Sequence, residues 1–167
     1  LEDNLSLKPA ELLARHAWTG GGRLDLFADP ARSADAIGDF AGARDAAGYR
    51  AFCRDGEAVY RALRESFIAA ERPSQLALVR RRGLTGLGPL LRARPWSSLW
   101  SKLGGYFHDP RLRQLFARYA TYVGSSPFAC PATLMLIAHV EQSGVWLIDG
   151  GMSALAKALG DLGARLG

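Results

Sequence analysis

The spacing of hydrophobic and polar residues predicts a chain dominated by helices. Between residues 45 and 71, apolar positions recur every three or four residues, as on one face of an α-helix, although Gly48 and Gly56 argue against one unbroken helix. Asp109-Pro110 is a strong start signal for a second helix, because the carboxylate caps it and proline suits its first position. Other helices are predicted over 33–40 with Ser33 as cap, over 131–141, and from 151 onward.

Two segments show the alternation of half-buried strands. Residues 12–28 predict a hairpin, because Gly20-Gly21-Gly22 tolerates the positive φ angles of a tight connection, and Leu24 and Leu26 then fall on one face. Residues 145–149 predict a short strand. The expected fold is therefore α+β and helix-dominated, with a small antiparallel sheet made from the hairpin and residues 145–149.

Composition narrows the class of protein. The 167 residues are 49% hydrophobic and 22% charged, which is typical of a globular domain. Two distant cysteines do not form a disulfide framework, and three histidines lack partners at metal-ligand spacing, so no metal site is expected. Neither a G-x-S-x-G motif nor an apolar run of the ~20 residues that span a bilayer is present.

The net charge of +5 conceals a strong asymmetry. Residues 72–118 hold ten basic residues and one acid, a net charge of +9, so the remaining residues carry −4. Such a segment is a solvated arginine-rich face, a nucleic-acid site or a membrane contact. Trp96 and Trp100, spaced i,i+4 among basic residues, favour shallow insertion into a membrane over residues 75–107. The contact residues predicted there are Arg80, Arg81, Arg82, Arg92, Arg94, Trp96, Trp100 and Lys102.

Two further features are compatible with a ligand site or with ordinary structure. A set of aromatic residues is suited to line a tunnel for a long apolar ligand, although periodicity alone favours core packing. Gly150-Gly151 before the last helix permits close approach of a flavin or substrate, yet such a dipeptide is more often a plain turn.

Several stretches of the chain resemble phytoene-desaturase-type carotenoid desaturases, in the order in which they occur in that family. The most specific are Leu112 to Phe128, with its Tyr-Val-Gly-Ser-Ser-Pro block, and Gly144 to Met152. Earlier and weaker matches are the glycine bend at 20–26, residues 48–52 and residues 107–113. Within the family, residues 112–128 are most similar to the methoxyneurosporene (hydroxyneurosporene) dehydrogenases, with bacterial phytoene desaturases second.

The resemblance implies an FAD-dependent, amine-oxidase-like oxidoreductase that abstracts hydride from a C40 polyene such as methoxy- or hydroxyneurosporene. It implies a peripheral enzyme on the cytoplasmic face of the membrane, with the carotenoid, the membrane surface and an FAD domain as partners and no nucleic acid. Gly150, Gly151 and Met152 would then approach the cofactor. The substrate-binding residues that it suggests are Phe116, Tyr119, Tyr122, Phe128 and Trp146.

The chain departs from the family in one respect. No G-x-G-x-x-G motif follows a strand, so the usual cradle for the FAD pyrophosphate is missing. Together with a first residue other than Met, this predicts a fragment that is inactive alone. Residues 1–149 would form a domain facing substrate and membrane, and 150–167 a turn and helix leading back to the missing FAD domain. The alternative is a non-catalytic basic module that binds membranes or nucleic acid.

Overall fold

A computed structural model describes residues 5–64, 68–69 and 96–167 and confirms the helix-dominated α+β fold. Aspartate residues cap the starts of two of its helices, and glycines with positive φ angles lie in several of the turns between its short elements. In chain order the elements are β1 (Leu7–Pro9), β2 (Leu12–Ala17), β3 (Arg23–Phe27), α1 (Pro30–Ala41), α2 (Ala43–Leu63), α5 (Leu99–Leu103), α6 (Pro110–Ala117), the 3-10 helices η4 (Arg118–Val123) and η5 (Ala132–Met135), α7 (Leu136–Gln142), β4 (Trp146–Ile148) and α8 (Gly151–Leu166).

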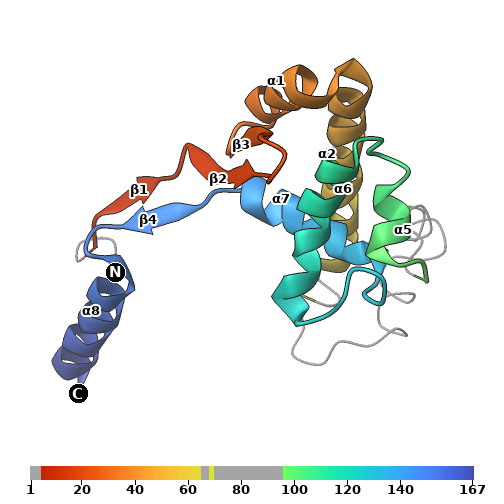
Figure 1. The fold of residues 1–167 in the computed structure, drawn as a ribbon. Coiled ribbons are helices and arrows are strands. Elements are labelled where there is room, and N and C mark those ends of the chain that lie inside the picture. The colour runs from red at the N-terminus through yellow and green to blue at the C-terminus, as the bar shows by residue number, and fades with distance from the viewer. Residues whose placement is uncertain (1–4, 65–67, 70–95) are drawn as a thin grey trace.

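The elements form a helical body and a projecting arm (Figure 1). Helices α1, α2, α5, α6 and α7 gather around a shared core, and the β2–β3 hairpin packs against α1. Strands β1 and β4 lead away from this body to α8, which carries the C-terminus at its tip. The predicted glycine turn at 150–151 therefore lies on the arm rather than in the helical body.

The strands pair antiparallel, but in two separate ribbons rather than one sheet. The predicted hairpin is confirmed: β2 pairs with β3, with His16 opposite Leu24, and both Leu24 and Leu26 are buried. The strand predicted at 145–149 does not join this hairpin. It pairs with β1, a three-residue strand that is too short to show an alternating pattern.

Both Asp-Pro dipeptides start helices. Asp109 caps α6 as predicted, and its carboxylate accepts a hydrogen bond from the Arg111 backbone N–H at 2.8 Å. Asp29 caps α1 in the same way, so the prediction of Ser33 as the cap is wrong. Ser33 is instead buried inside α1, where its hydroxyl bonds both the N–H and the carbonyl of Phe27 and thereby fixes the helix to β3.

An aromatic cluster occupies the centre of the helical body. The fully buried ring of Phe52 on α2 lies 5.1 Å from Phe116 and 5.6 Å from Phe107, measured between ring centroids. Phe116 belongs to an apolar stripe that the sequence spaces along this segment and that is buried except at its end: Leu112, Leu115, Phe116, Tyr119 and the exposed Val123. Val123 is exposed because η4 is a 3-10 helix with about three residues per turn, which shifts the stripe out of phase.

Glycine lets two neighbouring segments come close to α2. A Cβ on Gly48 would overlap the backbone carbonyl oxygen of Tyr106, and one on Gly56 would lie 2.8 Å from the carbonyl oxygen of Met135. The helix nevertheless runs unbroken through both positions, contrary to the sequence expectation. These glycines therefore serve packing at a modest cost in helix propensity.

The close approach at Gly48 predicts the effect of adding one methyl group. Gly48→Ala should lower the free energy of unfolding by about 1–3 kcal/mol, because the backbone of Tyr106 must move away. Gly38→Ala on α1 is the control, since its Cβ would lie at an ordinary 3.6 Å from the Ala46 Cβ and the change should stabilise by up to ~1 kcal/mol. Urea unfolding measures both values, and equal effects would contradict the packing argument.

Candidate functional site

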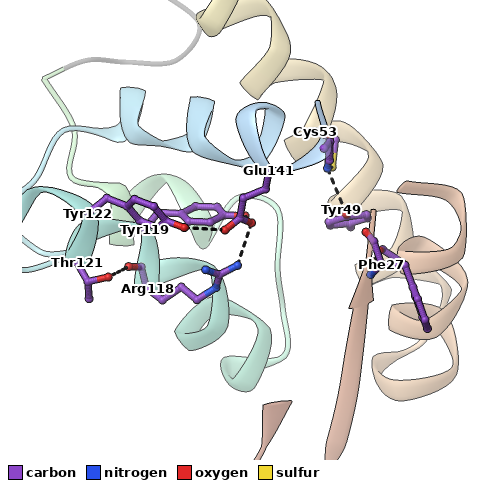
Figure 2. A network of polar contacts seen from close by, with 10 residues as sticks. Phe27, Tyr49, Cys53, Arg118, Tyr119, Thr121, Tyr122 and Glu141 are labelled. Carbon is purple, nitrogen blue, oxygen red and sulfur yellow. Dashed lines mark hydrogen bonds and ion pairs between the residues drawn. The ribbon is translucent and has the colours of Figure 1, made fainter. Parts of the chain in front are cut away.

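A single carboxylate on α7 organises the polar side chains beside the aromatic cluster (Figure 2). Glu141 Oε2 accepts hydrogen bonds from Arg118 Nη2 and from the Tyr119 hydroxyl, each at 2.9 Å. Its Oε1 accepts from the Tyr122 hydroxyl at 3.1 Å. The 3-10 geometry of η4 assists, because residues three apart eclipse each other and so bring both tyrosines to the same edge.

The hydrogen bonds of Glu141 with Arg118, Tyr119 and Tyr122, here called the Glu141 network, extend from the protein interior to its surface. The side chains of Arg118 and Glu141 are 29% and 16% exposed, whereas Tyr119 is buried and Tyr122 is 61% exposed. Burial raises the pKa of Tyr119 well above its ordinary value, and the negative charge of Glu141 raises it further. Tyr119 therefore remains a hydrogen-bond donor across the physiological pH range.

Gln142, the next residue on α7, extends the polar contacts toward α2. Its side-chain amide donates to the Tyr49 hydroxyl at 3.2 Å and lies 2.9 Å from the Cys53 sulfur. Burial raises the pKa of both Tyr49 and Cys53, which keeps the thiol protonated and a poor nucleophile. This part of the network therefore connects helices and offers no reactive group.

The turn between β4 and α8 fits part of what a bound dinucleotide requires. Gly150 and Gly151 have φ angles of 85° and 71°, a region that favours glycine, and no side chain caps the helix. The first N–H groups of α8 are therefore left to other acceptors, such as phosphate oxygens. The three-glycine fingerprint is missing from the sequence, so this turn supplies only one part of a cofactor site.

Comparisons with known proteins confirm the predicted resemblance, although no protein-family model matches the chain. A protein of Rubrivivax gelatinosus named hydroxyneurosporene desaturase is 49% identical over all of this chain and 32% of its own length. Its namesake in Cereibacter sphaeroides is 41% identical over 99% of the chain and 34% of that protein. The lycopene-forming phytoene desaturase of Pantoea ananas is 30% identical over the whole chain and 33% of its length.

This sequence is homologous to carotenoid desaturases. The chain spans about a third of the length of the curated relatives that it matches. Within the part of the chain that the structure describes, no helix is long and apolar enough to cross a membrane. The same residues contain no group of three or more histidine, cysteine and acidic side chains that could hold a metal ion.

The five aromatic residues suggested by the desaturase resemblance do not gather around one cavity. Phe116 and Tyr119 are core residues, whereas Tyr122, Phe128 and Trp146 are exposed by 61%, 64% and 58%. Trp146 lies on the arm, away from the other four. One open cleft of about 750 Å³ is lined instead by β2, β3 and α1. The tunnel assignment is untested by this geometry and stays a prediction.

The predicted membrane-contact residues fall partly within the structure. Trp96 is 72% exposed, whereas Trp100 is partly buried: its ring packs against Phe128 in a tilted arrangement, with 5.0 Å between centroids, and the Arg113 guanidinium lies 4.1 Å from its centroid. Lys102 lies 5.3 Å from the ring centroid of Tyr106. The remaining members lie outside the described residues: Arg80, Arg81, Arg82, Arg92 and Arg94.

Sequence reasoning missed the central residue of the site. It counted Arg118 among the charges of the basic segment, whereas the structure pairs that charge with Glu141. Glu141 itself carried no signal, because one glutamate near the end of a helix has no distinctive pattern and its partners lie about 20 residues earlier on another element. Only the spatial arrangement identifies it.

Removing the charge of Glu141 tests its organising role. Glu141→Gln should lower the free energy of unfolding by about 1.5–3 kcal/mol, because Arg118 then keeps a largely buried charge without a counter-charge. Glu57→Gln on α2 is the matched control, since Glu57 pairs with Arg61 at the surface and such pairs contribute about 0–1 kcal/mol. Urea unfolding of both variants measures the difference, and losses of equal size would refute the role of Glu141.

Proposed function

We propose that these residues are part of a flavin-dependent carotenoid desaturase that abstracts hydride from a C40 polyene bearing a hydroxyl or methoxyl group. The observation that carries the proposal is the gradient of similarity. Identity is 41–49% to relatives named hydroxyneurosporene desaturase and 30–31% to lycopene-forming phytoene desaturases, over essentially the same residues. FAD, when bound to the whole enzyme, supplies the hydride acceptor.

The proposal gives each part of this chain a task. The β4–α8 turn, with Gly150, Gly151 and Met152, would approach the cofactor through free backbone donors. Phe116 and Tyr119 would form the rigid wall behind a bound polyene, since both are held in the aromatic cluster. The arm would receive the other segments of the enzyme, which is supported by the exposure of Trp146, Leu147 and Met152.

We also propose that the enzyme is peripheral on the cytoplasmic face of a membrane, in which its substrate dissolves. Two backbone hydrogen bonds support a specific contact surface, from Leu99 N–H to the Cys130 carbonyl and from Trp100 N–H to the Pro127 carbonyl. They place the loop that carries Phe128 beside the start of α5. Phe128 and Trp96, which precedes α5 by three residues, are both largely exposed, and such exposed aromatic rings suit membrane insertion better than a tunnel wall.

Activity of the complete gene product tests the proposed function. Reconstituted with FAD in lipid vesicles, it should convert a hydroxylated C40 polyene into a product two hydrogens lighter that absorbs at longer wavelength. The isolated 167-residue chain should neither bind FAD nor react, because the pyrophosphate cradle is missing. A flavin-loaded complete protein that leaves every C40 polyene unchanged would refute the desaturase proposal.

Vesicle binding across a salt series tests the membrane surface. Basic residues contribute about 1 kcal/mol each near an anionic leaflet, and salt screens that attraction, whereas insertion of apolar side chains resists salt. Trp96→Ala with Phe128→Ala should therefore remove the salt-resistant binding to anionic vesicles. Leu166→Ala, an exposed apolar residue at the end of α8, is the control and should leave it intact.

The same series distinguishes the alternative function. A nucleic-acid module would prefer duplex DNA to vesicles and would lose nearly all binding as salt rises, through release of counterions. Co-sedimentation with DNA in parallel supplies that comparison. Preference for DNA would contradict the membrane proposal, as would vesicle binding that is indifferent to the changes at Trp96 and Phe128.

A further inference from the structure

Two buried polar atoms lack hydrogen-bond partners among the residues that the structure describes. They are Nε2 of His16 on β2 and Nε of Arg118 on η4. Buried polar atoms are nearly always paired, and leaving one unpaired costs about 1–3 kcal/mol. Two unpaired atoms in one region leave a place for one small polar group that satisfies both, either a buried water or part of a ligand.

The chain brings these two atoms to the same place. Trp18, the residue that follows β2, donates from Nε1 to the Gln114 side chain on α6 at 3.0 Å. His16 precedes Trp18 by two residues and thus shares its strand face, and the two rings lie 6.2 Å apart. Arg118 follows Gln114 by four residues and thus shares its helix face. The Trp18–Gln114 bond thus joins the segment of His16 to the helix that leads into Arg118, and the charges of Arg118 and Glu141 both act on the His16 ring.

The electrostatics of the two groups indicate the kind of ligand. Burial lowers the pKa of His16, and the positive charge of Arg118 lowers it further, so the imidazole is neutral at physiological pH and can accept a hydrogen bond. The charge of Arg118 is already matched by Glu141. What remains is one donor, the Arg118 Nε–H, and one acceptor, His16 Nε2 in the tautomer that carries its proton on Nδ1, with no net charge left to match. A neutral group that both accepts and donates fits this pair, and a hydroxyl does both.

We propose that His16 and Arg118 form a binding site for the hydroxyl group of an alcohol ligand, with Arg118 Nε–H donating to the hydroxyl oxygen and the hydroxyl donating to His16 Nε2. This inference rests on the proposed function, in which the ligand is the hydroxylated end of a polyene. His16, unlike Arg118, lines the cleft of about 750 Å³ between the hairpin and α1, so the polyene would approach the pair from the side of His16. Held at its polar end, the polyene would enter the enzyme in a single register.

The proposed site accounts for selectivity between two closely similar substrates. An unpaired charged donor and an unpaired acceptor remain buried when the ligand lacks a hydroxyl, and that penalty weakens its binding. One hydrogen bond to a charged donor corresponds to roughly a 10- to 100-fold difference in affinity. The complete protein should therefore bind a hydroxylated C40 polyene that much more tightly than the same polyene without the hydroxyl.

Binding measurements on the complete gene product test the site. The two polyenes, dispersed in detergent micelles, are titrated while the induced circular dichroism of the polyene is recorded. Arg118→Lys retains a positive charge facing Glu141 but has no donor at the Nε position, and His16→Phe retains a ring without an acceptor. Both variants should bind the two polyenes equally, with an affinity for the hydroxyl-free polyene that is no lower than that of the unaltered protein. Arg15→Lys, on the same strand and lining the same cleft, should retain the preference.

Each outcome is decisive for the site, and continued binding of the hydroxyl-free polyene shows that a variant has folded. If the unaltered protein has no preference, or both variants keep it, the two atoms bind only a buried water and the proposal is overturned. Desaturation measured in parallel separates this result from the proposed function. A hydroxyl preference without desaturation would support the hydroxyl site and refute the desaturase proposal. Desaturation without a preference would support the desaturase proposal and refute the site.

Discussion

The carboxylate of Glu141 is the interaction on which the polar side of this structure depends. It accepts hydrogen bonds from Arg118, Tyr119 and Tyr122, all on η4, and so fixes a short 3-10 helix against α7. Because it satisfies the terminal nitrogen of Arg118 and matches its charge, the guanidinium can lie partly buried. The Nε–H is then left as a donor within the protein.

The aromatic cluster provides the rigid support that this arrangement needs. Phe52 on α2 packs against rings from α6 and from the segment before it, and Gly48 and Gly56 let backbone carbonyls approach the same helix closely. Side chains held on closely packed helices keep their relative positions better than side chains on loops. A ligand end bound beside Arg118 would therefore meet a site formed before binding.

Local signals in the sequence were enough to predict much of the fold. Asp109-Pro110 identified the start of α6, and the triple glycine identified the hairpin, because caps and tight turns depend on neighbouring residues only. Asp29-Pro30 has the same signal as Asp109-Pro110 and starts α1, whereas the prediction placed the start at Ser33. The pairing of β1 with β4 escaped prediction because three-residue strands some 140 positions apart leave no periodic pattern.

The candidate site was less predictable because its members are distant in sequence. Arg118 belongs by sequence to the basic segment, and only its contact with Glu141 removes it from that surface. Phe128 is by sequence one aromatic residue among several, and only its contact with Trp100 and its exposure relate it to the proposed membrane surface. His16 comes near Arg118 only in the folded chain, where Trp18 bonds Gln114 and the charge of Arg118 acts on the His16 ring.

The most direct test of the shared hydroxyl site is a double-mutant cycle on His16→Phe and Arg118→Lys, with affinity for the hydroxylated polyene as the readout. One hydroxyl that bridges both side chains makes the two changes strongly coupled, so the double variant should bind no more weakly than either single variant. The coupling free energy should then approach the whole effect of one change, about 1.5–3 kcal/mol. Additive losses would show that the two residues act independently and would contradict the account.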